Sequence, residues 1–392
     1  MDVMKTDIKT LLHISHTDIR VDSRILKEMQ SLLPIPQCKV VGVGFELDEG
    51  VPFSSKYLNY EIITLKLLTR SLRFLPRVAR HILNFIELSW KLLFIGLKVK
   101  PTVVHCHDTL VLPIGWLLSN ILGCKLVYDA HELESQKNGQ TSLLSRGTLI
   151  LEKFCWKRID LLISVSDSIL KWYHHHLGLV NSILILNSPV QDMDESKSVS
   201  MYESGDYFHS KYLLPEQAVV FVYLGILGKG RCIESYLAAF SHERLREAHL
   251  VFVGYGDLDV EIKKYAELYS NIHLHPPVPH AQVVGVVKNA DYGLCFIENI
   301  SLSDYFCLPN KLFEYAFAGL DVLASDFPDI QQVVNRYSLG ICCSPDSDSI
   351  LKAVEEALLR KPTKRFRDIS QLAWPAQADR LQSSYGELLK TA

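Results

Sequence analysis

The sequence lacks the features that direct a chain into a membrane, through a secretory pathway or onto nucleic acid. Its first residues, MDVMKTDIKTLLHIS, contain no basic start, apolar stretch and small-residue cleavage site in series, so we expect no secretory signal. No apolar run approaches the roughly 18 to 20 residues that cross a bilayer. A net charge of −3 gives no reason to expect nucleic acid as the main partner.

The cysteines lack any pairing pattern. There are nine of them, an odd number, and no two are spaced as C-x-x-C. Several lie inside apolar segments, as in VVHCHD and YGLCFIE. This distribution favours buried, reduced thiols over a disulfide framework or a zinc site, and it predicts a cytoplasmic protein.

What the chain contains is a repeated alternation of short apolar runs and helical patterns. Its 392 residues are too many for one ordinary core. The alternation is typical of parallel sheets covered by helices on both faces. In the first half the predicted strands are 9–15, 39–43, 101–105, 125–129, 161–165 and 182–186, and in the second half 218–224, 249–253, 271–274, 292–296 and 321–324.

A change of composition separates the two halves. The stretch QDMDESKSVSMYESGD is polar and acidic and has little that can pack. We therefore predict a first domain over 1–190, a linker over 191–215 and a second domain over 216–373. A final helix over about 374–392 is expected to pack back on one of the halves. Two such α/β domains joined once predict a ligand cleft between them, at the carboxyl ends of the strands.

The segment LPNKLFEYAFAGLDVLASD carries the strongest chemical signal. Pro309 and Asn310 suit a helix start, with proline in the first turn. Lys311 and Glu314 then share one face near that start. Backbone N–H groups at a helix start and one lysine suit a diphosphate, and a carboxylate one turn later suits the hydroxyls of a ribose. The alternative is an ordinary amphipathic helix with an exposed Lys–Glu pair.

Two glycine-rich turns follow predicted strands of the second half. In VFVYLGILGKGRCIE the strand runs into Gly225 and then Arg231, and in FVGYGDL it runs into Gly254. Glycine allows a close approach of backbone to ligand, and arginine binds phosphate through two parallel hydrogen bonds. Plain loops are the alternative for each turn taken alone.

Together these segments resemble glycosyltransferase family 4, which has the GT-B fold of two Rossmann-like domains with parallel sheets facing an interdomain cleft. YLGILGKGRCIE, FVGYG and LPNKLFEYAFAGLDVLASDFPDI are similar to motifs of the family's second domain. HISHTDIRVDSRILKEMQSL, VVHCHDTLVLPIGWLL, LVYDAHELES and IDLLISVSDSILKWYHHHLG resemble motifs of its first domain. The match follows the chain in order and leaves out mainly 48–98 and the linker.

The resemblance implies a role for each matching residue. The second domain is expected to bind the nucleotide sugar, and the first the acceptor. The residues implied are Arg231 and Lys311 for the diphosphate, with Asn310 at the helix start; Glu314 for the ribose; Gly225 and Gly254 beside the nucleotide; His131 facing the transferred sugar; and Asp18 and Arg20 for the acceptor. His107 is a further acceptor candidate because it lies at the end of a predicted strand, and a satisfied buried histidine is the equal alternative. His131 is read first as a sugar-positioning residue and second as a general base. The resemblance also implies retention at the anomeric carbon, with no metal and no cofactor beyond the donor.

The chain departs from the family pattern at one acidic position. The family's E-x7-E motif places a carboxylate eight residues before Glu314, where this chain has Phe306. Glu298 and Asp304 are the nearby alternatives, and Glu298 is the one we favour for the donor site.

Residues 70–100 combine basic and aromatic side chains. Seven Arg and Lys residues oppose only Glu87 there, and Phe74, Phe85, Trp90 and Phe94 are interleaved with them. Such a segment favours an anionic membrane surface. The alternative is a helix with its apolar side in the domain core.

These observations predict a retaining hexosyltransferase that uses a UDP- or GDP-type sugar in surface polysaccharide or O-antigen assembly, peripheral on the inner face of the cell membrane. Its acceptor is expected to be a saccharide or a lipid-linked saccharide. One alternative is a nucleotide-sugar 2-epimerase of the same architecture, and another is a catalytically silent partner subunit. VYDAHEL and LPNKLFEY favour the transferase over the epimerase.

Overall fold

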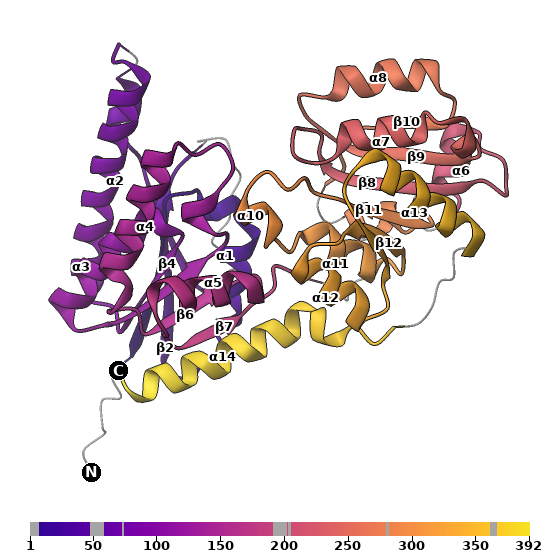
Figure 1. The fold of residues 1–392 in the computed structure, drawn as a ribbon. Helices are drawn as coiled ribbons and strands as arrows, with labels where there is room; N and C mark the ends of the chain where they lie inside the picture. The colour runs from indigo at the N-terminus through magenta and orange to yellow at the C-terminus, as the bar shows by residue number, and fades with distance from the viewer. Residues whose placement is uncertain are drawn as a thin grey trace. The chain divides into compact units, whose positions relative to one another are not determined.

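The chain folds into two compact α/β units. The computed structural model describes residues 8–47, 59–72, 74–190, 202, 205–279, 282–360 and 367–392. Unit 1 comprises Met1–Leu186 together with Pro375–Ala392, and unit 2 comprises Asn187–Trp374. Each unit is built on one sheet of parallel strands (Figure 1). The predicted fold class, two Rossmann-like α/β domains, is confirmed.

The sheet of unit 1 has seven parallel strands in the order β3-β2-β1-β4-β5-β6-β7. Its strands are β1 (Lys9–Ser15), β2 (Cys38–Phe45), β3 (Glu61–Leu65), β4 (Val103–His107), β5 (Lys125–Ala130), β6 (Leu161–Ser164) and β7 (Ser182–Leu184). The strands β4 and β6 are buried along their whole length, as expected for a sheet covered on both faces. The strand order reverses between β1 and β4, which makes their carboxyl ends the switch point where α/β sheets bind ligands.

Helices cover the two faces of this sheet. They are α1 (Ser23–Ser31), α2 (Arg77–Val99), α3 (Leu112–Leu122), α4 (Ser142–Trp156), α5 (Asp167–Leu177) and α14 (Trp374–Lys390), with short 3₁₀ turns at Ile19–Val21, Leu68–Ser71, Thr109–Val111 and Glu134–Gln136. Neighbouring residues of β4 show the two faces. Cys106 packs under Gly115 of α3, where a Cβ would lie 2.1 Å from its sulfur. His105 points the other way and meets Tyr385 of α14 at 2.6 Å.

Side-chain contacts fix α1 and α14 in unit 1. The Asp22 carboxylate caps α1 by accepting hydrogen bonds from the backbone N–H groups of Arg24 and Ile25. On α14, the Gln377 side chain accepts a hydrogen bond from Leu186 N at 3.1 Å. Gln382 of the same helix donates to the Ser31 carbonyl at the end of α1, at 2.8 Å. The last helix of the chain therefore completes the first unit.

Unit 2 holds a six-stranded sheet in the order β10-β9-β8-β11-β12-β13. Its strands are β8 (Val219–Ile226), β9 (Ala248–Tyr255), β10 (Ile272–His275), β11 (Tyr292–Cys295), β12 (Asp321–Ser325) and β13 (Gly340–Cys343). Its helices are α6 (Tyr207–Tyr212), α7 (Ile233–Phe240), α8 (Asp259–Leu268), α9 (Val283–Val287), α10 (Leu302–Tyr305), α11 (Asn310–Phe317), α12 (Pro328–Arg336) and α13 (Ser347–Arg360), with 3₁₀ turns at Glu243–Leu245 and Ser370–Leu372. An aromatic core that includes Phe221, Tyr236 and Phe252 lies between the sheet and α7 and α13.

Two predictions differ from the structure at element level. The linker was expected to run to residue 215, but α6 lies inside that range, and its Phe208 is fully buried. The Tyr207 hydroxyl is 2.8 Å from His275 at the end of β10, so this helix is part of unit 2. Most of the earlier linker lies outside the described residues. The strands β3 and β13 were not predicted.

All nine cysteines lie in the described part of the chain and are free. Among the helices that the structure describes, none has the length and apolar character needed to span a bilayer.

Candidate functional site

The predicted donor residues of unit 2 come from strand ends, loops and one helix around the switch point of its sheet. The strand order reverses between β8 and β11, and ligands of open α/β sheets bind where such a reversal occurs. Arg231 follows the β8 turn, and Glu298 follows β11. The helix α11, which carries Lys311 and Glu314, precedes the neighbouring strand β12.

Two glycines allow the ends of β8 and β9 to approach each other closely. Gly225 and Gly254 are register partners on these strands. Gly225 has φ +130°, and a Cβ on Gly254 would lie 1.9 Å from the Gly225 carbonyl oxygen. Any side chain at Gly254 would therefore force the strand ends apart. Backbone therefore meets backbone at these two positions, an arrangement that also allows a ligand to approach closely.

The helix α11 is locked onto the sheet by Tyr315. Its hydroxyl accepts a hydrogen bond from Leu224 N at 2.8 Å, and its ring fills the space above Gly293, where a Cβ would lie 2.3 Å from the ring. The helix begins at Asn310. Pro309 is its N-cap, one position before the first helical turn in which it was predicted, and the N-cap makes no side-chain hydrogen bond. The first N–H groups of α11 are thus held near the strand ends.

Lys311 is the most unusual side chain of unit 2. Its ammonium nitrogen is buried and has no hydrogen-bond partner among the described residues. It lies 4.0 Å from the centre of the Tyr223 ring, a cation–π contact. An unpaired buried charge is costly, so a structure that retains one has a position prepared for an anion.

Arg231, Lys311 and Glu314 act on the same buried thiol. Burial raises the pKa of Cys295 to about 12, while the positive charges of Lys311 and Arg231 oppose this rise and Glu314 adds to it. The same two cations also oppose the rise that burial causes in the pKa of Cys232. These shared effects are consistent with one donor site for the three residues, which stays a prediction.

The two candidates for the missing carboxylate have different surroundings. Glu298 Oε1 accepts a hydrogen bond from Cys232 N at 3.2 Å, beside Arg231. Asp304 Oδ2 instead accepts one from the Ser301 hydroxyl at 2.7 Å and belongs to the cap of the short helix α10. Glu298 is therefore adjacent to the predicted diphosphate site, whereas Asp304 stabilises a local turn.

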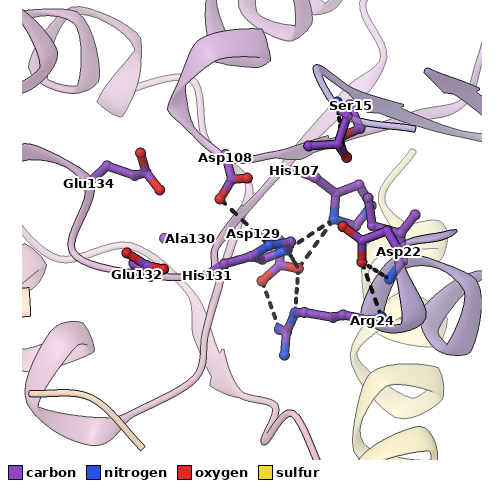
Figure 2. A network of polar contacts seen from close by, with 12 residues as sticks. Ser15, Asp22, Arg24, His107, Asp108, Asp129, Ala130, His131, Glu132 and Glu134 are labelled. Carbon is purple, nitrogen blue, oxygen red and sulfur yellow. Dashed lines mark hydrogen bonds and ion pairs between the residues drawn. The ribbon is translucent and has the colours of Figure 1, made fainter. Parts of the chain in front are cut away.

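In unit 1, His131 lies just beyond β5, between two carboxylates (Figure 2). Its Nε2 is 2.8 Å from Asp129 Oδ2, and its Nδ1 is 3.6 Å from Asp108 Oδ1. Burial alone would lower the pKa of His131, but Asp129 and Asp108 outweigh it and raise the pKa to about 9. The ring is therefore protonated near neutral pH. A protonated ring donates hydrogen bonds, which suits sugar positioning, and both readings of His131 stay predictions.

His107 lies where it orients His131. It was expected to contact the acceptor, but its ring is fully buried. Its Nε2 is 3.0 Å from His13, and its Nδ1 is 3.3 Å from both His131 and Asp129. Because the His107 ring is buried, no face of it is open to a ligand. Its contacts instead support the His131–Asp129 pair.

Asp18 and Arg20 are tied to each other in the loop after β1. Arg20 donates to both Asp18 oxygens, at 2.9 and 2.7 Å. Asp18 Oδ2 also accepts a hydrogen bond from Leu47 N at 3.1 Å, which ties this loop to the end of β2. Asp18 thus orders the loop. Contact of this pair with an acceptor stays a prediction.

Sequence reasoning missed a buried charged network beneath His131. Arg24 binds both oxygens of Asp129, at 3.0 and 2.8 Å, and its Nε is 3.1 Å from Glu28 (Figure 2 shows the Arg24–Asp129 pair). Burial and the negative charge of Asp129 raise the pKa of Glu28 to about 8, although the positive charge of Arg24 opposes this rise. The sequence held one signal, an arginine and a glutamate four apart on the face of α1 that turns inward.

Two buried groups in this network have the composition of metal ligands. One comprises His13, His105 and His107; the other comprises Glu28, Asp129 and the last two of these histidines. The His105 and His107 rings are stacked, 4.3 Å apart and 18° from parallel. Lone pairs lie in the ring planes, so stacked rings do not direct them at one ion. Asp129 is already bound by Arg24. The contacts describe a hydrogen-bonded network, and the expectation that no metal is needed stays a prediction.

Comparisons with known proteins cover both units. The model of "Glycosyltransferase Family 4" matches residues 48–187, and that of "Glycosyl transferases group 1" matches residues 218–360. No curated protein sequence matches the chain.

Several solved structures share the fold at low sequence identity. A sucrose-phosphate synthase from Thermosynechococcus elongatus has a TM-score of 0.77 and 16% identity, over 98% of this chain and 100% of that one. HepE from Anabaena, solved in complex with UDP-glucose, has a TM-score of 0.66 and 11% identity, over 98% and 100%. A glycosyltransferase from Rickettsia africae has a TM-score of 0.65 and 13% identity, over 98% and 99%.

Proposed function

Because the chain belongs to glycosyltransferase family 4 and has the GT-B fold, we propose that it transfers a hexosyl group from a UDP- or GDP-sugar, with retention at the anomeric carbon. Its acceptor is a saccharide or a lipid-linked saccharide of surface polysaccharide assembly. The observation that carries this proposal is the buried, unpartnered ammonium of Lys311 beside the α11 start. UDP-glucose in the related HepE supports a uridine nucleotide.

The donor site performs its chemistry through charge. The bond between the sugar C1 and the diphosphate oxygen breaks, and its electron pair stays on the diphosphate. Lys311, Arg231 and the N–H groups at Asn310 stabilise this developing charge more than they stabilise the bound donor. The acceptor oxygen bonds to C1 and its proton passes to the leaving diphosphate. His131, cationic near neutral pH, binds the sugar and takes no proton.

A nucleotide panel tests the donor class. We expect UDP, UDP-glucose, GDP or GDP-mannose to raise the thermal unfolding temperature of the chain, and ADP and dTDP sugars to raise it less, because binding to the folded state alone stabilises it. The same panel in the Lys311→Ala variant is expected to give no shift. An epimerised free UDP-sugar formed without an acceptor would favour the 2-epimerase instead. The absence of any nucleotide shift would favour the silent partner subunit.

We also propose that α2 rests on an anionic membrane surface at the cytoplasmic side. The helix packs on unit 1 through Leu88, Leu92 and Gly96. A second apolar stripe on the opposite side stays exposed, and its members are Val78, Ile82, Ile86, Trp90 and Phe94. The core alternative accounts for the first stripe only. Trp90 and Phe94 are 71% and 66% exposed.

The charges of this helix suit the same surface. Arg77, Arg80, Lys91 and Lys98 are basic residues of α2, and Arg73 lies outside the described residues. The opposing Glu87 is already engaged by Lys91 at 2.7 Å and by Thr69 N at 2.8 Å. Basic residues beside exposed aromatic ones are typical of helices that lie in the headgroup region.

Vesicle flotation tests this surface. The chain is expected to float with phosphatidylglycerol vesicles and not with phosphatidylcholine vesicles. Binding should fall as the salt concentration rises, since each Lys or Arg near the surface contributes about 1 kcal/mol of electrostatic binding energy. Trp90→Ser with Phe94→Ser should abolish flotation. Leu359→Ser, which removes an equally exposed side chain of unit 2, is the matched control and should float. Salt-insensitive binding, or flotation of the double variant, would contradict the proposal.

A further inference from the structure

The helix α4 carries an apolar stripe on its exposed side. Leu143, Ile150 and Phe154 are 83%, 68% and 63% exposed, and with Gly147 between them they follow one another at intervals of three or four residues. Residues at such intervals lie on one face of a helix. Glu152 marks the inner side, because it is fully buried. Single exposed apolar side chains are ordinary, but a stripe along a whole helix marks an interaction surface.

The charges on the exposed side of α4 are basic. Arg146 and Lys153 are exposed, and Lys157 follows as the C-cap. They are seven and four residues apart, which places them along one flank of the apolar stripe. Glu152, which is buried, is the acidic residue of this helix. An apolar stripe with a basic flank complements anionic lipid headgroups, and α2 has the same combination.

The helices α2, α3 and α4 lie side by side in one layer of unit 1 (Figure 1). Gly96 of α2 lies against Leu118 of α3, where a Cβ would be 2.4 Å from the leucine side chain. The rings of Trp116 on α3 and Phe154 on α4 have their centres 4.7 Å apart. Between its two neighbours, α3 has the uncharged sequence LPIGWLLSNIL, and its Ile121 is exposed. The apolar stripes of α4 and α2 therefore belong to the same helix layer.

The helix on the other face of the sheet has a polar outer side. This helix, α14, packs on unit 1 through Tyr385. Its exposed residues beyond the first turn are Asp379, Ser383, Glu387 and Lys390. Both layers cover the same sheet, so core packing accounts for the inner sides of α4 and α14 alike. It does not account for the apolar outer side of α4.

We propose that α4 is a second contact of unit 1 with an anionic membrane, so that the layer of α2, α3 and α4 rests broadside on the lipid headgroups. This inference rests on the membrane contact proposed for α2 and deepens it, because it names the face of unit 1 that meets the lipid. Two contacts on one folded unit reinforce each other, since binding of the first holds the second close to the surface. Loss of either helix contact therefore weakens binding strongly.

Quantitative flotation with phosphatidylglycerol vesicles tests the apolar stripe. Leu143→Ser with Ile150→Ser is expected to lower the partition coefficient about tenfold or more, because two apolar side chains no longer leave water on binding. Leu268→Ser replaces an equally exposed side chain of α8 in unit 2. It is the matched control and should bind like the wild-type chain. The unfolding temperatures of both variants should match that of the wild type, since the replaced side chains are exposed.

A charge reversal tests the basic flank separately. Lys153→Glu should lower the partition coefficient about tenfold at low salt and less at high salt, because salt screens the attraction between lysine and the headgroups. Lys390→Glu makes the same change at the end of α14, in the opposite helix layer. It is expected to bind like the wild type.

The outcomes distinguish this inference from the proposed contact of α2. If Leu143→Ser with Ile150→Ser floats like the wild type while Trp90→Ser with Phe94→Ser does not, α2 alone meets the membrane and the inference is overturned. A wild-type chain that does not float refutes both. A wild-type dimer in size-exclusion chromatography that the α4 variant converts to a monomer would assign the stripe to a second copy of the chain, and would also overturn the inference.

Discussion

Lys311→Ala and Arg231→Ala are each expected to abolish detectable transfer while the chain remains folded. A single preorganised group that stabilises developing charge contributes about 10²–10³ in rate, and Lys311 has no other described partner that would compete for its charge. Its removal takes an uncompensated ammonium out of the interior. The unfolding temperature of Lys311→Ala should therefore change little, and that of Lys311→Met should rise.

The measurement is product formation with the nucleotide sugar selected by the panel, together with circular dichroism for the fold. Lys229→Ala is the matched control, because this lysine lies in the same glycine-rich loop as Arg231 but is exposed. It should retain activity. Unchanged product formation by either Lys311→Ala or Arg231→Ala would contradict the assignment of the diphosphate site.

Arg24→Met is expected to cost about 3–5 kcal/mol of unfolding free energy, the usual result when one partner of a buried ion pair is removed. The guanidinium is 3% exposed and binds both Asp129 oxygens. It also donates to the Ile185 carbonyl at 3.0 Å. Asp129 has a strongly lowered pKa, since Arg24 and His131 outweigh the effect of burial. Without Arg24 this carboxylate stays buried with too little positive charge around it.

Urea unfolding followed by tryptophan fluorescence measures this loss. Lys39→Met is the matched control, because Lys39 pairs with Glu61 at 2.7 Å with both side chains half exposed. Such surface pairs contribute about 0–1 kcal/mol. The double variant Arg24→Met with Asp129→Asn should lose less than the sum of the single variants, since the two groups interact directly. A loss for Arg24→Met as small as that of Lys39→Met would show that the network is not structural.

The hydrophobic pattern of the sequence was sufficient to predict most strands of the two sheets. The strand Lys9–Ser15 has the predicted bounds, and the others differ by a few residues at their ends. The missed strands are both at sheet edges. Glu61–Leu65 follows a segment outside the described residues, and Gly340–Cys343 has four residues and begins with glycine. Edge strands are buried on fewer sides, so their sequences carry a weaker apolar signal.

By itself the sequence determined the α/β class and the family, and it supplied the segments proposed to bind the donor, because these depend on features that are local in the chain. Strand periodicity, glycines at the ends of β8 and β9, and the Lys311–Glu314 spacing on α11 are of this kind. Only the tertiary structure decided which carboxylate lies beside Arg231, and that His107 is buried. It also decided that His131 is held between Asp108 and Asp129 with Arg24 below. These facts depend on which strands are neighbours. A parallel sheet brings together residues that are far apart in the sequence, and the charges of these residues then set one another's protonation.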